Sequence, residues 1–214
     1  MDKKNTADLQ ELLAIWQTFQ YDNQLSNDQI AAFKQYAQML VEWNEKFNIT
    51  AITDYRDIIV SHFQDSLSLA SCTDLTKIKG MADVGAGGGF PGIPLKIVYP
   101  HIFMVLIEVN QKKVHFLREV IAQLKLSNIE VVDLDWRTFI RKTQYPIDLF
   151  CARASLSMQE LLRVFKGDSM YDDAQLVYWA SRHYEPEKEH QSHVSRSCSY
   201  LLYTTERRLF FFNK

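Results

Sequence analysis

Residues 83–94 form a glycine-rich stretch that constrains this chain more than any other segment. Four of the seven glycines fall between positions 85 and 89. An apolar run that includes Val84 precedes them, and a helical run that includes Leu95 follows and ends before Pro100. We therefore predict a strand, a tight turn and a helix. The turn would lie at the carboxyl edge of a sheet, where α/β proteins bind their ligands.

The spacing of these glycines separates two classes of ligand. Dinucleotide-binding folds use Gly-x-Gly-x-x-Gly, but when that pattern is counted from Gly85, Phe90 stands where its third glycine would be. The chain instead reads Asp-x-Gly-x-Gly-x-Gly, with Asp83 followed by Gly85, Gly87 and Gly89. An anion at Asp83 would repel a pyrophosphate and attract an ammonium or a sulfonium. The loop resembles the S-adenosylmethionine loop of class I methyltransferases, and the alternative is a surface turn without a ligand.

A second acid stands where a ribose-binding carboxylate is expected. The predicted strand 102–108 ends at Glu108, about 20 residues beyond the glycines, the separation typical of such an acid. A carboxylate can accept hydrogen bonds from both vicinal hydroxyls of a ribose. The alternative is a solvated residue at the start of the next helix, where the helix dipole favours acids.

Composition favours a single-domain cytoplasmic protein. A chain of 214 residues, 47% of them hydrophobic, can bury one substantial core. No apolar run approaches the ~20 residues of a membrane span, and the amino terminus is polar, so we expect no membrane contact. Cys72, Cys151 and Cys198 are widely spaced and odd in number, which indicates neither a disulfide framework nor a metal site. We therefore expect reduced thiols.

The net charge of −2 argues against a protein that binds nucleic acid through bulk electrostatics. Any contact with RNA must therefore be local. The polar segment from Arg182 to Arg196 holds three histidines without metal-ligand periodicity, and we predict a solvated loop there.

Two kinds of pattern divide the chain near residue 75. Residues 1–75 carry apolar side chains at helical spacing, and Ser26 with Gln29 forms a predicted capping box. The remainder, 76–214, alternates strands near 81–85, 102–108, 128–132, 147–152, 175–180, 197–204 and 207–213 with helices near 92–99, 110–125 and 157–165. We predict an α/β fold: a helical amino-terminal extension packs on a mostly parallel seven-stranded sheet, which ends in an antiparallel hairpin about Thr205-Glu206. Together they would form one structural domain.

Several separated stretches resemble the RsmG family, also called GidB, in the same order along the chain. They are Glu42-Trp43-Asn44, Phe47-Asn48-Ile49-Thr50, His62-Phe63-Gln64-Asp65-Ser66, the loop from Asp83 to Leu95, and Ile147 to Ala154. The resemblance implies a class I, Rossmann-like methyltransferase fold and a cytoplasmic enzyme. It also implies methyl transfer from S-adenosylmethionine to N7 of a guanine in 16S ribosomal RNA, within the small subunit or its precursor. We expect a monomer.

The resemblance also implies where the cofactor binds. The family's cofactor positions fall on Gly85, Phe90, Trp136, Arg137 and Arg153. Asp135 could accept a hydrogen bond from the adenine amine or could cap a turn. Three roles stay open for Arg153, which could hold the cofactor's carboxylate, hold a substrate phosphate or form a structural ion pair.

No dedicated catalytic acid or base is expected for this reaction. Guanine N7 carries an unprotonated lone pair at neutral pH, so methylation needs only an in-line approach and a dry, oriented site. Methylation of an exocyclic amine typically uses Asp/Asn-Pro-Pro-aromatic after the fourth strand, where this chain has Cys151-Ala152-Arg153-Ala154. Carbon methylation needs an attacking thiolate, but we interpret Cys151 as a buried strand residue.

Substrate contacts are predicted in two places. His62, Asp65 and Ser66 share one helix face, where they form either a buried polar cluster or a substrate contact. The family often has Leu-Lys-Gly after the fifth strand, but this chain has Trp179-Ala180-Ser181, so Arg182 is the candidate replacement for the missing lysine. Trp179 could stack on a base or belong to the core.

Two other functions remain open at this stage. A methyltransferase that acts on a small molecule or a protein would share every cofactor residue. A catalytically silent RNA-binding assembly factor could keep the same fold without binding the cofactor.

Overall fold

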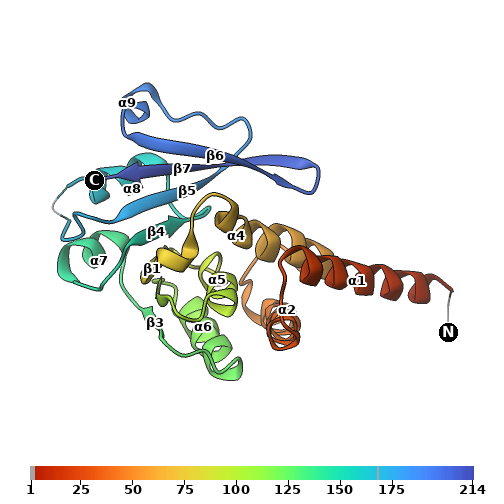
Figure 1. Ribbon diagram of the computed structural model, residues 1–214. Coiled ribbons are helices and arrows are strands. Elements are labelled where there is room, and N and C mark those ends of the chain that lie inside the picture. The colour runs from red at the N-terminus through yellow and green to blue at the C-terminus, as the bar shows by residue number, and fades with distance from the viewer. Residues whose placement is uncertain (1–2, 168) are drawn as a thin grey trace.

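A seven-stranded sheet forms the centre of the molecule (Figure 1). The computed structural model describes residues 3–167 and 169–214, with side chains from residue 9 onward. The strands are β1 (Gly80–Val84), β2 (Phe103–Ile107), β3 (Ile129–Val132), β4 (Leu149–Ala152), β5 (Gln175–Ser181), β6 (Val194–Leu202) and β7 (Thr205–Asn213). Their order is β3-β2-β1-β4-β5-β7-β6. The seven predicted strands are therefore confirmed.

The first five strands are parallel, and β7 runs antiparallel to both β5 and β6. The predicted hairpin is confirmed, but its turn is Tyr203-Thr204, because Leu202 already pairs with Thr205. Tyr203 adopts a φ of 54°, in the left-handed region that tight hairpin turns use.

Helices cover both faces of the sheet because its side chains alternate between two hydrophobic cores. Met81 and Met104 face the core that contains α5 (Gly92–Val98) and α6 (Gln111–Gln123). Ala82 and Val105 face the core that contains α7 (Trp136–Lys142) and α8 (Met158–Phe165). The sequence did not predict α7, because Trp136, Phe139 and Ile140 follow helical spacing over only seven residues, which is too short a window to separate a helix from a turn.

A helical layer precedes the sheet and packs on the side of α5 and α6. It contains α1 (Lys3–Asp22), α2 (Asn27–Phe47), α3 (Tyr55–Asp57), the π-helix η1 (Ile58–Gln64), α4 (Asp65–Leu67) and the 3-10 helices η2 (Ser68–Ser71) and η3 (Leu75–Lys77). The predicted capping box at Ser26 and Gln29 is confirmed. No helix in the described part of the chain combines the length and apolarity needed to cross a bilayer.

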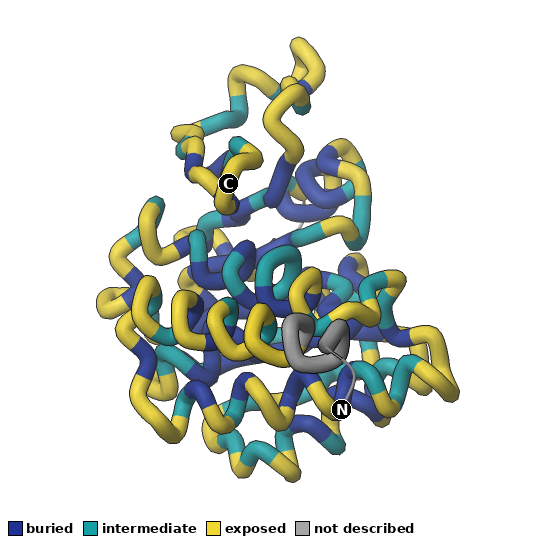
Figure 2. The backbone as a smooth tube through the Cα atoms, turned by 90° about the vertical axis from the view of Figure 1, so that its right-hand side faces the viewer, coloured by how far each residue is buried: buried dark blue, intermediate teal, exposed yellow. Residues whose placement is uncertain are grey.

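Buried aromatic side chains join this layer to the sheet. Phe19 and Phe33 pack edge to face at 5.0 Å, and Tyr36 stacks on Phe63 at 5.3 Å and on Phe90 at 5.6 Å. All of them belong to the same buried cluster as the strand residues of that face. Figure 2 shows the result: buried segments lie inside, and the exposed turns of the helices form the outer surface.

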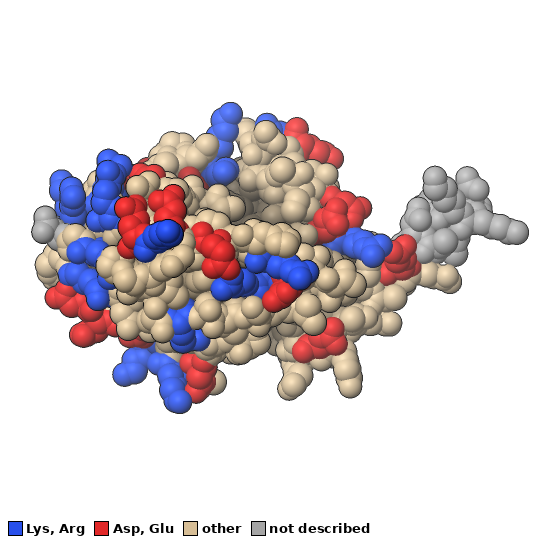
Figure 3. Space-filling model, turned by 90° about the horizontal axis from the view of Figure 1, so that it is seen from above, with Lys and Arg blue, Asp and Glu red and all other residues tan. Residues whose placement is uncertain are grey.

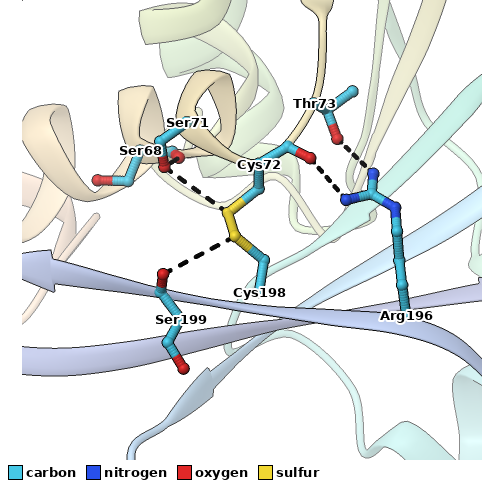
Figure 4. The surroundings of a disulfide bond; sticks show 7 residues. All are labelled: Ser68, Ser71, Cys72, Thr73, Arg196, Cys198 and Ser199. Carbon is cyan, nitrogen blue, oxygen red and sulfur yellow. Dashed lines mark hydrogen bonds between the residues drawn. A yellow bond between two sulfur atoms is a disulfide. The ribbon is translucent and has the colours of Figure 1, made fainter.

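A disulfide between Cys72 and Cys198 ties the end of η2 to β6 (Figure 4). Its Cα atoms lie 6.0 Å apart, across 126 residues of sequence. The expectation of reduced thiols is wrong for this pair, because sequence spacing does not reveal which distant segments meet in space. Arg196 joins the same two segments by donating to the Cys72 carbonyl at 2.6 Å. Cys151 is free and buried, as predicted.

The polar segment from Arg182 to Arg196 is more ordered than predicted. It contains the short helix α9 (Lys188–Gln191), and β6 already begins at Val194. The prediction of a loop is therefore wrong for these two parts of the segment.

Candidate active site

A cleft of about 630 Å³ opens at the carboxyl edge of the sheet. The ends of the first four strands contribute Gly85, Glu108, Asp135 and Arg153, and the helical layer contributes Thr50 and His62. From the strand order, Glu108 and Asp135 lie toward one end of the cleft and Arg153 toward the other, with the glycine loop between them. The topology thus gathers residues that lie more than 100 positions apart in the sequence.

The glycine loop depends on conformations that other residues avoid. Gly85, Gly87 and Gly89 have φ angles of 67°, 59° and 94°, in the left-handed region. A Cβ atom on Gly85 would also lie 2.5 Å from the Cβ atom of Ser155. Glycine at position 85 therefore allows the residues after β1 and β4 to approach each other closely.

Glu108 is held at the cleft by three backbone donors. Its Oε2 accepts from the Gly87 N–H at 2.8 Å, and its Oε1 accepts from Val109 at 3.0 Å and Asn110 at 2.9 Å. An ionised carboxylate has about four acceptor sites. Glu108 therefore keeps capacity for a ligand hydroxyl while its position is fixed.

Asp83 lies beneath the glycine loop and does not line the cleft. It is fully buried, and its Oδ2 accepts from the Gly92 N–H at 2.8 Å. Its Oδ1 has no hydrogen-bond partner among the described residues. Burial raises the pKa of Asp83 to about 7, although the Gly92 hydrogen bond and the Arg153 charge oppose the rise. A positive charge above the loop would stabilise the ionised form.

A chain of polar side chains closes the other end of the cleft. Arg153 donates to Asp65 Oδ2 at 2.8 Å and to the Ser61 carbonyl at 3.0 Å. Its other terminal nitrogen lies 3.2 Å from His62 Nδ1, and His62 Nε2 lies 2.9 Å from Thr50 Oγ1. Only 10% of the Arg153 side chain is exposed. The structural ion pair left open for Arg153 is therefore present, and it coexists with a place on the cleft wall.

These contacts fix the protonation of His62. A guanidinium only donates, so Nδ1 must accept from Arg153 and the proton must reside on Nε2, which donates to Thr50. Burial and the Arg153 charge lower the pKa of His62 to about 3, in agreement with a neutral ring. The ring also stacks on Phe90 at 4.1 Å, with 14° between the planes.

The sequence of the chain matches one family of known proteins. The family model described as rRNA small subunit methyltransferase G, GidB, matches residues 29–204. The chain belongs to the GidB family. Ribosomal RNA small subunit methyltransferase G of Desulfitobacterium hafniense is 43% identical over 155 residues, which are 72% of this chain and 64% of that protein. Its counterpart in Exiguobacterium sp. is 48% identical over 106 residues, 50% of this chain and 44% of that protein.

The chain thus covers only about half the length of these curated GidB relatives. Solved structures agree with the class I methyltransferase fold. MtNAS in complex with MTA and tNA aligns with a TM-score of 0.60 at 15% identity, over 100% of this chain and 90% of that chain. The METTL16 MTase domain aligns with a TM-score of 0.58 at 13% identity, over 86% of this chain and 80% of that chain.

The structure brings most of the residues predicted to bind the cofactor together on one cleft. The cleft is lined by Gly85, Gly87, Phe90, Glu108, Asp135, Trp136 and Arg153, whereas Asp83, Gly89 and Arg137 do not line it. Arg137 points elsewhere and pairs with Glu160 at 3.1 Å. Asp135 caps α7 by accepting from Thr138 at 3.0 Å, so the capping role left open in the sequence is present.

The predicted substrate residues separate into buried and exposed groups. Asp65, Ser66 and Trp179 are buried, and the Trp179 indole donates to the Asp65 carbonyl at 3.2 Å. The buried alternative left open for these three residues is therefore present, and Tyr200 on β6 also donates to Asp65 Oδ1 at 2.6 Å. Of the His62 helix face, only His62 reaches the cleft. Arg182 is exposed, outside the cleft lining, and pairs with Glu206 at 3.4 Å.

Three polar residues of the cleft were not assigned to it from the sequence. Lys113 lies on α6, with Nζ 3.9 Å from the position of a Cβ atom on Gly87. Ser155 follows Ala154, which has a φ of 53°, and its Oγ is buried without a partner in the described part of the chain. Thr50 lies in a stretch noted only for its resemblance to the family. No periodic pattern marks these positions, because each reaches the cleft through an irregular segment or from one turn of a helix.

Proposed function

We propose that this protein transfers a methyl group from S-adenosylmethionine to N7 of a guanine in 16S ribosomal RNA. The observation that carries the proposal is the arrangement of the glycine loop and Glu108 on one cleft with a histidine that has no free lone pair. The glycine loop and Glu108 suit the cofactor, and the histidine suits an acceptor that needs no base. The RNA substrate is inferred from membership of the GidB family.

The described residues fit the cofactor. Glu108 would accept from the ribose, Trp136 would border the adenine, and the Ser155 hydroxyl and Arg153 offer donors for the methionine carboxylate. The unpartnered Asp83 Oδ1 places negative charge below the loop, where it would attract the cationic groups. When bound, S-adenosylmethionine supplies an electrophilic methyl group, and transfer exchanges its S–C bond for an N7–C bond without release of a proton.

The kind of acceptor atom is inferred from the state of the candidate bases and the candidate nucleophile at the cleft. His62 is the one imidazole on the described cleft wall, and its Nδ1 lone pair is occupied by Arg153. The Glu108 carboxylate lies at the other end of the cleft, where three backbone N–H groups already engage it. The buried Cys151 thiol, whose pKa burial raises well above its usual range, suits no nucleophilic role. Guanine N7, which needs neither a base nor a thiolate, is the acceptor that matches.

Surface charge supports a structured RNA substrate bound through local contacts. On the face shown in Figure 3, Lys and Arg side chains are interspersed with Asp and Glu. A mixed surface and a net charge of −2 give weak affinity for isolated RNA. We therefore propose that a monomer acts on the small subunit or its precursor in the cytoplasm.

A competition between acceptors tests this proposal. Labelled methyl should enter small subunits in preference to naked 16S RNA, metabolite extract or protein, and Glu108→Gln should abolish most of the transfer. Glu119→Gln, on α6 but outside the cleft lining, is the matched control and should leave it unchanged. Transfer to a metabolite alone would support a small-molecule methyltransferase. Calorimetry without any S-adenosylmethionine binding would instead support a silent assembly factor.

A further inference from the structure

We propose that the Thr50 hydroxyl recognises O6 of the guanine whose N7 receives the methyl group. The inference rests on the proposed function and adds a specificity-determining residue to it. It follows from the hydrogen bonds that surround Thr50 and from its place on the rim of the cleft.

The Thr50 hydroxyl is an obligate donor. Its oxygen accepts from His62 Nε2–H at 2.9 Å and from the Ile52 N–H at 3.1 Å. A hydroxyl oxygen has two acceptor sites and one proton to donate. Both acceptor sites are thus in use, and no acceptor among the described residues takes the proton. Any further partner of Thr50 must therefore be a hydrogen-bond acceptor.

The elements around Thr50 hold it in this state. Asn44 Oδ1, near the end of α2, accepts from the Thr50 N–H at 2.8 Å. Arg153 is anchored by the buried Asp65 carboxylate and in turn fixes the tautomer of His62. His62 is therefore a positioning residue. Arg153 determines that its proton resides on Nε2, and His62 donates that proton in a hydrogen bond to Thr50.

Thr50 lies on the wall of the cleft, where we place the acceptor base. Thr50 comes from the segment between α2 and α3, outside the sheet, and it is partly exposed next to the exposed Ala51. It lies on the side of the cleft formed by Arg153, away from Glu108 and Asp135. A base that enters from solvent passes this rim before it reaches the residues beneath.

Guanine and adenine differ at the exocyclic group on C6, which lies beside N7 on the same edge of the base. Both carry an N7 acceptor, but guanine presents O6, an acceptor, and adenine presents the N6 amine, a donor. An obligate donor that faces this edge forms a hydrogen bond with O6 of guanine. When adenine is present, the same donor faces the N6 amine, so two donors oppose each other. Thr50 therefore selects guanine without a charged group.

Three variants of the full chain test the inference on small subunits that carry guanine or adenine at the mapped target position. Thr50→Val should lower kcat/KM for the guanine subunits by about tenfold, the cost of one lost hydrogen bond. Its Kd for S-adenosylmethionine should stay within about twofold of wild type, and Thr50→Ser should restore turnover. His62→Phe keeps the aromatic ring on Phe90 but frees one acceptor site of Thr50, so its guanine-over-adenine ratio should fall by about tenfold.

Each result decides the matter. If Thr50→Val turns over like wild type, or if it loses cofactor affinity as much as turnover, Thr50 does not recognise O6. An unchanged guanine-over-adenine ratio in His62→Phe would also overturn the inference. A wild-type chain that binds S-adenosylmethionine but methylates no ribosomal RNA would instead overturn the proposed function, and this inference with it.

Discussion

At the scale of single residues, the site is built from side chains whose charge is set by their surroundings. Glu108 is oriented by three backbone donors and Asp83 by one, although both are carboxylates at the ends of neighbouring strands. Their burial differs too, because Asp83 lies beneath the loop and Glu108 borders the cleft. One is therefore suited to contact a ligand and the other to act through its charge.

The raised pKa of Asp83 predicts a pH-dependent affinity. A cationic ligand needs the ionised form, so below pH 7 binding must release the proton from Asp83. We expect the affinity for S-adenosylmethionine to fall by nearly tenfold per pH unit below about 7, the limit for one linked proton. Calorimetry at pH values from about 5.5 to about 8.5 covers this transition.

Asp83→Asn is the control for this prediction, and its affinity should be weaker and nearly independent of pH. Stability gives a second check on the sign. Because the folded state holds the proton more tightly than the unfolded state, the contribution of Asp83 to stability is present below its ordinary pKa near 4 and is lost as the pH rises through 7. Equal pH dependence in wild type and variant would contradict this account.

Glu108→Gln should weaken cofactor binding by about 1.5–3 kcal/mol, the range for hydrogen bonds to a charged group. The amide keeps one acceptor oxygen but loses the charge that its three N–H partners stabilise. Equilibrium dialysis with labelled S-adenosylmethionine measures the change against Glu119→Gln. An affinity equal to that of the control would remove Glu108 from the site.

At the scale of elements, the helical layer supports the glycine loop. The buried Tyr36 hydroxyl on α2 donates to the Gly88 carbonyl. Tyr36→Phe should lower the free energy of unfolding by about 1–3 kcal/mol, because it leaves a buried carbonyl without a donor. It should also weaken cofactor binding, which a purely structural effect far from the loop would not do.

Urea unfolding and calorimetry on the same sample separate these two effects. Tyr171→Phe is a matched control, since it removes a buried tyrosine hydroxyl on the α7 side of the sheet, where it contacts Thr143 and the Tyr145 N–H. It should lose stability without loss of cofactor affinity. Equal losses of affinity in the two variants would show that Tyr36 has no special link to the loop.

The disulfide is a second link between elements. Cys72→Ser should destabilise the protein by about 2–4 kcal/mol, because the bond closes a long loop in the unfolded chain. Chemical denaturation with and without reductant measures this difference. The reductant should have no effect on a Cys72→Ser/Cys198→Ser double variant, since its remaining cysteine, Cys151, is buried and unpaired. An effect of reductant on both proteins would point to a cause other than this bond.

At the scale of the whole molecule, the sequence predicted those features that depend on periodic spacing or on neighbouring residues. Successive side chains of a strand point to opposite faces of the sheet. The glycines at positions 85, 87 and 89 adopt the left-handed conformations that only glycine takes easily. The cleft and Glu108 followed from these features. The orientation of Arg137, the pairing of Cys72 with Cys198 and the place of Thr50 did not, because each depends on contacts between distant segments.

The whole protein also depends on joining two halves at one site. The helical layer supplies Thr50 and His62, and the sheet supplies the glycine loop, Glu108 and Arg153. Arg153 and Asp65 bridge the two parts at 2.8 Å, with both side chains largely buried. Separation of the parts would therefore destroy the cleft, because neither half contains all of its walls.

We propose that this protein methylates N7 of one guanine in 16S ribosomal RNA. The most direct test maps N7-methylguanine in 16S RNA from cells that carry the wild-type gene, the Glu108→Gln variant or no gene. We predict one position that is methylated with the wild-type gene and unmethylated in the other two strains. The same methylation pattern in all three strains would contradict the account.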